Sequence, residues 1–422
     1  MKNNQKSVLL FTIFGTGHHL VHFNIVIKAM INKGYEITLA LPESCINKDS
    51  YNTHILPYIK HVKIVKHKHK HLNNLFINSW RECTVLRNAI LSDNNPYDAI
   101  LALNCSQIPF LWPIFRVFNS KALRNLAVIK FGMTSTGLNH APPTIRTKIN
   151  NLIRKNLLSL HLNGAIKTID NYAFTELENG SRRFQKIFTL IPDPIDKIPI
   201  VDKISARGYL GIPDDVFVVS ISGSISSHPR KNCPILINAL SDKNLNKNVC
   251  LLIAGKLSAG IDEYIKKSQA FQDKRIFIID RYLSDEELTT VTCASDLVCT
   301  PYSGHFCPSG IVLRAVKCDV PVLVPNYHWF KFMVDKFNIG WKLKALTKSA
   351  IVDSLNDISE KNSQLQHLTA QTVLIKKYFS EDNFAAHWLL QFEGNQVYSF
   401  EELLIDYNNI GNTSEPTPLA LD

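Results

Sequence analysis

The chain has 422 residues, 45% of them hydrophobic and 20% charged, an ordinary balance for a soluble globular protein and enough chain for two domains with separate cores. Its nine cysteines show no C-x-x-C pair or ligand-like spacing, which argues against a zinc site or a disulfide framework and favours reduced thiols. No run of about 18 or more apolar residues is present, and residues 1–6 lead into a predicted strand rather than a signal-peptide core. We therefore expect a cytoplasmic protein.

The N-terminal half begins like a Rossmann domain. An apolar strand at 8–14 is followed by a turn containing Gly15 and Gly17, by apolar positions at helical spacing, and by a second strand at 35–41. Further strands are predicted at 99–103, 126–131, 165–169 and 187–191. Two nearby glycines allow a tight turn that a ligand can approach, although Gly-x-Gly alone is a weak signal.

The net charge of +11 is unevenly distributed along the chain. Residues 1–200 contain 25 Lys and Arg against 11 Asp and Glu, a net of +14, and residues 201–422 contain 22 against 25, a net of −3. A basic half favours nucleic acid, anionic lipid or an acidic acceptor as partner, and nothing in the sequence resembles a groove-reading module. We expect no nucleic-acid partner. We expect the basic half to dock on an anionic surface, either the inner face of a membrane, as a peripheral contact, or an acidic lipid-linked or polysaccharide acceptor.

The basic excess is concentrated in one run. Lysines at 60, 63, 66, 68 and 70 lie close together, and residues 66–71 alternate Lys with His. The histidines offer metal ligands, but the alternating lysines repel a cation. We expect a solvated basic loop rather than a metal site, and we assign the docking on an anionic surface to these lysines.

The C-terminal half alternates strands and helices. Strands are predicted at 216–222, 249–254, 275–280, 296–301 and 320–325, with helices between them, one of which starts at a capping box at 284–287. This βαβαβ order predicts a parallel sheet whose strands share one carboxyl edge.

Two anion-binding features follow strands of this half. The first strand ends in Ser222, Gly223 and Ser224, and the basic pair Arg230 and Lys231 comes next. About eighty residues later Pro308, Ser309 and Gly310 open a helix, whose first N–H groups and positive dipole end favour an anion. A diphosphate fits both features. The alternative for Arg230 and Lys231 is solvated surface at a helix start.

The same region resembles the nucleotide-sugar-binding half of the two-Rossmann (GT-B) glycosyltransferases, most closely glycosyltransferase family 4. The matching segments are 191–194, 207–213, 229–232, 284–288, 294–298 and 301–302. The resemblance implies an α/β fold of two Rossmann-like domains facing across a cleft. It implies an acceptor domain at 1–193, a nucleotide-sugar-binding domain at 194–378 and a crossover helix at 379–400. The polar composition of residues 408–418 predicts that the tail at 401–422 is partly disordered.

The chain departs from the family pattern at the donor sugar. Family 4 members usually carry two glutamates there, and the matching positions hold Phe306 and Arg314. The arrangement of His305, Ser309, Gly310 and Arg314 resembles a variant found in a subset of these sequences. Arg314 either grips phosphate or forms a structural salt bridge. The resemblance thus places Gly223, Ser224, Arg230, Lys231, His305, Ser309, Gly310 and Arg314 at the donor.

Histidines mark the expected acceptor side. Gly17 and His18 resemble the Gly-His pair of inverting family 1 members, in which the His is the catalytic base, and imidazole chemistry suits that role. The alternative is that His18 only caps the turn or bonds the acceptor. His19 is a second candidate, and His140 lies where family 4 members often place a cleft-facing His, or else it is a surface-loop residue.

These observations predict a metal-independent, hexosyltransferase-like glycosyltransferase that moves a sugar from a nucleotide sugar to an unknown acceptor, for example in surface polysaccharide or glycan synthesis. We expect no cofactor, because the nucleotide sugar is the donor substrate. A sugar-nucleotide epimerase would need a carboxylate-rich cleft, which the sequence does not show. The main alternative is a catalytically inactive GT-B protein that binds a nucleotide sugar as a sensor or scaffold, and the missing glutamates favour it.

Overall fold

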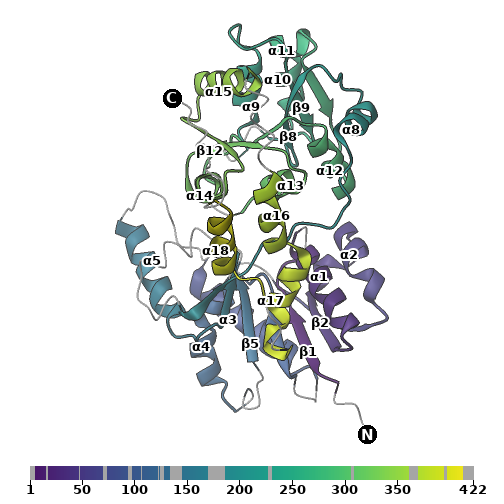
Figure 1. Cartoon of the computed structure of the whole chain (residues 1–422). Helices are drawn as coiled ribbons and strands as arrows, with labels where there is room; N and C mark the ends of the chain where they lie inside the picture. The colour runs from purple at the N-terminus through teal and green to yellow at the C-terminus, as the bar shows by residue number, and fades with distance from the viewer. Residues whose placement is uncertain are drawn as a thin grey trace. The chain divides into compact units, whose positions relative to one another are not determined.

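The computed structural model of the chain describes residues 5–15, 18–46, 48–69, 74–93, 97–105, 107–121, 123, 128–133, 145–169, 186–226, 231–305, 308–360, 369–393 and 397–411. The chain divides into two compact units (Figure 1). Unit 1 comprises residues 1–194 and 381–399, and unit 2 comprises residues 195–380 and 400–422. Each unit is built around its own parallel sheet.

In the described part of unit 1, seven parallel strands lie in the order β3-β2-β1-β4-β5-β6-β7. They are β1 (Ser7–Phe11), β2 (Glu36–Pro42), β3 (Val62–His67), β4 (Ala99–Ala102), β5 (Val128–Met133), β6 (Ile166–Thr168) and β7 (Phe188–Leu190). Val8 and Leu10 of β1 enter one core cluster and Leu9 and Phe11 enter another. Both faces of the sheet are therefore buried, which explains why the strand is a continuous apolar run.

Helices cover both faces of this sheet. The described helices are α1 (His18–Asn32), α2 (Asp49–His54), α3 (Leu75–Ile90), α4 (Ile108–Phe118), α5 (Ile145–Leu158) and α17 (Glu381–Glu393), with short 3₁₀ turns η1 (Glu43–Cys45) and η2 (Leu56–Tyr58). Residues of α1 and α17 pack in the cluster of Val8 and Leu10, and residues of α3 and α4 pack in the cluster of Leu9 and Phe11. The helix α17 lies within the expected crossover segment and belongs to unit 1. In the sequence, residues 195–380 of unit 2 come between α17 and the rest of unit 1.

The prediction of a solvated loop at residues 66–71 is wrong for His67 and His69. His67 ends strand β3, its Nε2 atom lies 2.8 Å from the Thr12 carbonyl oxygen, and its ring stacks on Phe11. Burial lowers the pKa of His67, and the His69 side chain is 8% exposed. Only the intervening lysines point to solvent, because side chains of a strand alternate between its two faces. Residues 70 and 71 lie outside the described residues.

Unit 2 shows six parallel strands among its described residues, in the order β10-β9-β8-β11-β12-β13. They are β8 (Phe217–Ser222), β9 (Val249–Ala254), β10 (Ile276–Ile279), β11 (Leu297–Cys299), β12 (Val322–Pro325) and β13 (Gly340–Leu343). The first five agree with the predicted strands, with shifts of up to two residues at their ends.

The described helices of unit 2 are α8 (Lys203–Leu210), α9 (Cys233–Leu240), α10 (Ile261–Lys266), α11 (Gln269–Gln272), α12 (Asp285–Cys293), α13 (Gly310–Lys317), α14 (His328–Phe337), α15 (Lys348–Glu360), α16 (Thr369–Tyr378) and α18 (Phe400–Gly411). Residues of α9 and α15 share one core cluster with Val219 of β8, and residues of α8 and α12 share another with Val218. The predicted capping box is present at Ser284 and Glu287. It fixes the start of α12 by satisfying two backbone donors.

The expected polar tail begins with a helix. Its first eleven residues belong to α18, whose Phe400 packs against Tyr378 of α16, while residues 412–422 lie outside the described residues. Within the described ranges, no helix combines the length and the hydropathy needed to cross a lipid bilayer.

Candidate functional site

The strand order of unit 2 creates a switch point between β8 and β11. The chain starts at β8, moves through β9 to the edge strand β10, and then returns to the other side of β8 with β11. The connections that follow β8 and β11 therefore leave in opposite directions, which opens a crevice at their carboxyl ends. In the sequence, the candidate donor residues all follow these two strands.

Two glycines bring the ends of β8 and β9 into contact. Gly223 and Gly255 have φ values of 98° and 138°, which favour glycine. A Cβ atom on Gly255 would lie 1.8 Å from the Gly223 carbonyl oxygen. A Cβ atom on Gly223 would lie 3.4 Å from Cδ1 of Ile311, in the first turn of α13. The turn after β8 therefore lies against the N-terminus of α13, and the exposed Ser224 follows it.

The N-terminus of α13 is the second part of the site. Ser309 is the N-cap residue, is 6% exposed, and makes no side-chain capping hydrogen bond. The exposed Gly310 begins the helix. Because the first N–H groups of a helix have no partner within it, this end offers donors and a positive dipole end to an anion.

Lys231 lies across the same crevice and contacts Tyr302, which follows β11. Its Nζ atom donates a hydrogen bond of 2.8 Å to the Tyr302 hydroxyl and lies 4.4 Å from the centre of the ring. Tyr302 itself is 1% exposed, so the ring is a fixed support for the ammonium group. Lys231 thus brings a positive charge to the switch point.

Aromatic side chains hold the segment that carries His305. The His305 ring contacts those of Tyr302 and Phe330 at centroid distances of 5.7 and 5.5 Å. The Tyr327 hydroxyl donates to the Tyr302 carbonyl oxygen at 2.7 Å and accepts from the His305 backbone N–H at 3.4 Å. Burial raises the pKa of Tyr327, which keeps the hydroxyl protonated as a donor. His305 is therefore placed by the same network as Tyr302.

Arg314 is engaged with carboxylates. Its guanidinium donates to a carboxylate oxygen of Asp285 at 2.7 Å and to the Asp285 carbonyl oxygen at 2.8 Å, and it lies 3.3 Å from a carboxylate oxygen of Asp196. These contacts join α13 to the start of α12 and to the segment before α8. They match the salt-bridge alternative for Arg314, whereas a role in gripping phosphate stays a prediction. Arg230 and Phe306 lie outside the described residues.

Unit 1 has the same kind of switch point, between β1 and β4. His18 is the first residue of α1, directly after this point. The His19 ring stacks on Phe14, and the His19 carbonyl oxygen accepts a hydrogen bond of 3.4 Å from Asn104, which follows β4. The acceptor-side candidates Gly17 and His140 lie outside the described residues.

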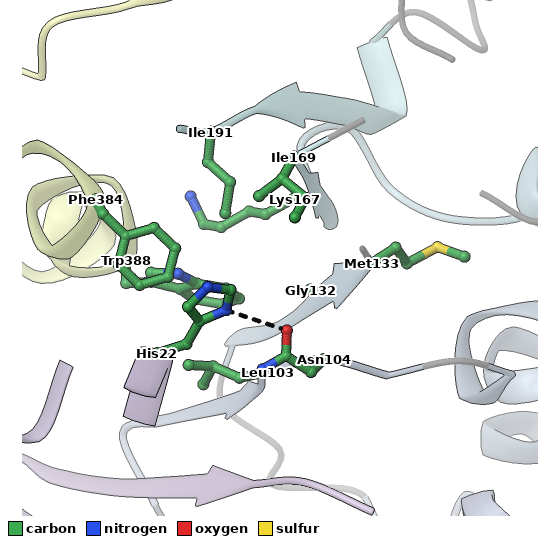
Figure 2. A pocket seen from close by; sticks show the side chains of 10 residues that line it. All are labelled: His22, Leu103, Asn104, Gly132, Met133, Lys167, Ile169, Ile191, Phe384 and Trp388. Carbon is green, nitrogen blue, oxygen red and sulfur yellow. Dashed lines mark hydrogen bonds between the residues drawn. The ribbon is translucent and has the colours of Figure 1, made fainter. Parts of the chain in front are cut away.

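His22, one helical turn after His18, lies in a buried polar group that the sequence did not predict. Its Nδ1 atom is 3.3 Å from Oδ1 of Asn104 (Figure 2). Its Nε2 atom is 3.3 Å from a carboxylate oxygen of Asp193. Asn104 has a φ of 54°, a conformation that asparagine tolerates better than most residues. This group fixes the start of α1 relative to the ends of β4 and β7.

A cavity of about 10 Å³, close to the room that one water molecule needs, adjoins this group. Figure 2 shows Lys167 of β6 on one side of it and Phe384 and Trp388 of α17 on another. Lys167 is 5% exposed and donates a hydrogen bond of 2.6 Å to the His387 carbonyl oxygen. Burial lowers the pKa of Lys167 to about 7, with the charge of Lys130 adding to the effect. The hydrogen bond from Lys167 connects strand β6 with helix α17.

The described residues contain no cluster of three or more His, Cys, Asp or Glu side chains able to hold a metal ion. Among the described residues of the switch point of unit 2, Lys231 supplies a positive charge and the N-terminus of α13 supplies a positive dipole end.

Neither a protein-family model nor a curated protein sequence matches the chain significantly. Solved structures match over nearly all of it. HepE from Anabaena, in complex with UDP and glucose, has a TM-score of 0.62 at 15% identity, covering 93% of this chain and all of that one. Sucrose-phosphate synthase from Thermosynechococcus elongatus has a TM-score of 0.66 at 13% identity, covering 92% and 99%. A protein assigned as UDP-N-acetylglucosamine 2-epimerase from Listeria monocytogenes has a TM-score of 0.59 at 15% identity, covering 93% and 98%.

This likeness and the two parallel sheets confirm the predicted fold class, α/β with two Rossmann-like units of the GT-B type. The identities are too low to show more than the fold, and membership of family 4 stays a prediction.

Sequence reasoning did not single out Tyr302, Tyr327 or Asn104 as site residues. Tyr302 formed part of a matched segment, and Asn104 directly follows a predicted strand. Both positions lie at carboxyl ends of central strands, which is the signal that would have identified them.

Proposed function

We propose that the protein is a glycosyltransferase that transfers a sugar from a nucleotide-sugar donor to an acceptor hydroxyl. The observation that carries this proposal is the arrangement at the switch point of unit 2, where Gly223 lies against the first turn of α13 and Lys231 lies on Tyr302. A backbone turn without side chains, a helix N-terminus and an ammonium group together suit a diphosphate. HepE, a protein of similar fold, has been solved with UDP-glucose.

In the proposed reaction the acceptor oxygen attacks the anomeric carbon, and the bond from that carbon to the diphosphate oxygen breaks. The nucleoside diphosphate leaves with the electron pair, so negative charge develops on it. Lys231, Arg230 and the N–H groups at Ser309 and Gly310 would stabilise this charge, which is the main electrostatic task and requires no metal. Gly223 and Ser224 would contact the diphosphate through their backbone. His305 would face the donor sugar.

The proton of the acceptor hydroxyl needs a base. We assign this role to His18, because the start of α1 lies at the switch point of unit 1 and an imidazole can accept a proton near neutral pH. We place the transfer in the cytoplasm at the inner membrane face, since the +14 charge of residues 1–200 would attract anionic lipid.

The experiment that tests the proposal uses the full-length protein and sugar-labelled UDP-, GDP- and ADP-sugars, with and without a lipid and polysaccharide extract as acceptor. We expect release of nucleoside diphosphate from one nucleotide class, stimulated by the extract and strongly slowed in the Lys231→Ala variant. Isomerised nucleotide sugar as the product would instead identify an epimerase.

The second candidate function is that of a binding protein without catalysis. The observation that favours it is Arg314, which occupies a position where family 4 members usually have a glutamate and which is held by Asp285 and Asp196. This function predicts tight binding of a nucleotide sugar with no release of nucleoside diphosphate under any of these conditions.

A further inference from the structure

Helix α5 of unit 1 exposes a row of apolar side chains to solvent, whereas a surface helix usually turns its apolar side chains toward the core. It packs on the unit through its last turns, where Leu158 is fully buried and Arg154 lies over the Phe110 ring of α4. Its large apolar side chains point the other way, at positions i, i+4, i+7 and i+8. They are Ile145, Ile149, Leu152 and Ile153, with exposed fractions of 79%, 52%, 61% and 37%. These positions form one stripe along the helix.

The apolar surface continues onto α3 and α4. Leu75, the first residue of α3, packs in the same cluster as Leu157 and Leu158 of α5. The exposed Phe76 and Ile77 follow it. On the same helix Trp80 is 42% exposed, and its ring lies 6.4 Å from that of Phe118, which ends α4 and is 75% exposed. Figure 1 shows α3, α4 and α5 on one side of unit 1. We call this surface the α3–α5 face.

The charges of the α3–α5 face have one sign. The three helices contain seven Lys and Arg residues and a single acidic residue, Glu82, which is completely buried. Lys148 and Lys155 are exposed and lie beside the apolar stripe of α5. A large apolar patch on a soluble protein marks an interaction surface, and the surrounding charge selects an anionic partner.

The composition of the face suits a lipid bilayer. Aliphatic side chains in a stripe, flanking lysines and a half-exposed Trp are the features of helices that lie in the interface of a membrane. The lysine-rich run at residues 60–70 is less suited to contact with a lipid bilayer. There Lys63 donates to Asp93 at 2.6 Å, Lys68 lies 3.7 Å from Glu43, and His67 is largely buried.

We propose that the α3–α5 face docks on the surface of an anionic lipid bilayer, with Ile149 and Leu152 inserted below the headgroups and Lys148 and Lys155 against the lipid phosphates. This inference names a partner and a surface, and it does not depend on sugar transfer. It also assigns the membrane contact to the α3–α5 face in place of the lysines at 60–70.

The test is co-sedimentation of the full-length protein with vesicles of phosphatidylcholine alone and of phosphatidylcholine mixed with phosphatidylglycerol, over a salt series. The wild-type chain should bind the anionic vesicles, and added salt should weaken the binding. Two double variants, Ile149→Ser with Leu152→Ser and Lys148→Glu with Lys155→Glu, should each bind at least about tenfold more weakly. Circular dichroism should show that both remain folded.

The matched control carries Ile204→Ser and Val373→Ser, two exposed apolar residues of unit 2 with exposed fractions of 71% and 62%. It should bind like the wild type. Equal binding to neutral and anionic vesicles, or wild-type binding by either double variant of α5, would overturn the proposal. So would a dimer in solution that the Ile149→Ser, Leu152→Ser variant converts to a monomer, because the face would then be an interface between copies of this chain.

Discussion

Gly255 approaches Gly223 so closely that the two residues leave no room for a side chain, since a Cβ atom on Gly255 would lie 1.8 Å from the Gly223 carbonyl oxygen. The contact joins the ends of β8 and β9 at the proposed diphosphate site. It makes glycine a structural requirement of the site, independently of any ligand.

The Gly255→Ala variant should therefore lower the stability of unit 2 and distort the turn after β8. We expect a cost of more than about 3 kcal/mol, because the strained φ of 138° adds to a clash with backbone. Gly260→Ala is the matched control, since Gly260 also has a positive φ but has open space around it. Thermal unfolding should show a clearly larger loss for Gly255→Ala, and equal losses would mean that the turn adapts to a side chain.

The Tyr302→Phe variant tests the contribution of the Tyr302 hydroxyl apart from that of its ring. The ring would still support the Lys231 ammonium, but the 2.8 Å hydrogen bond would be lost. We expect nucleotide affinity to fall only about 2- to 10-fold, which is the net worth of one hydrogen bond. Calorimetric titration measures this change. A loss as large as that of Lys231→Ala would show that the hydroxyl itself contacts the ligand.

The His18→Ala variant tests the proposed base. If His18 takes the acceptor proton, its removal should lower turnover by about 10²- to 10⁴-fold and leave donor affinity unchanged. His18→Gln, which keeps hydrogen bonding but cannot act as a base near neutral pH, should be equally slow. Normal turnover in either variant would assign His18 a structural role.

Lys167 should make stability depend on pH. Its pKa is lowered to about 7 in the folded chain, from an ordinary value of 10.5. Between these values the unfolded chain binds the additional proton, so stability should rise with pH from about 7 to 10, by at most about 1.4 kcal/mol per pH unit. The Lys167→Met variant should lose this part of the rise. Urea unfolding of both proteins at a series of pH values measures the difference, and parallel curves would contradict the assignment.

Much of the fold could be predicted because the central strands are buried on both faces. The run at 249–254 coincides with β9, and that at 216–222 begins one residue before β8. β3 was missed because its exposed lysines interrupt the apolar pattern, and its His67 is buried by contacts with Thr12 and Phe11 that lie far away in sequence.

The site was predictable only as a set of strand ends. The sequence placed Gly223, Lys231 and Ser309 at one edge of a sheet, and β8, β11 and α13 bring them there. It could not show that Lys231 meets Tyr302, 71 positions away, or that Arg314 pairs with Asp285 and Asp196. Such pairs depend on side-chain directions that only the packed sheet and helices determine.

Lys231 and the N-terminus of α13 should together bind a nucleoside diphosphate. Isothermal titration of the full-length protein with UDP, GDP and ADP measures this binding. We expect one of them to bind, and Lys231→Ala to bind it about 10- to 100-fold more weakly with an unchanged melting temperature. Lys348→Ala is the matched control. It removes an exposed lysine that pairs with Asp242, which follows the C-terminus of α9, and it should bind the nucleotide normally. Wild-type affinity in the Lys231→Ala variant, or no binding of any of the three by the wild type, would show that these groups do not bind a nucleoside diphosphate.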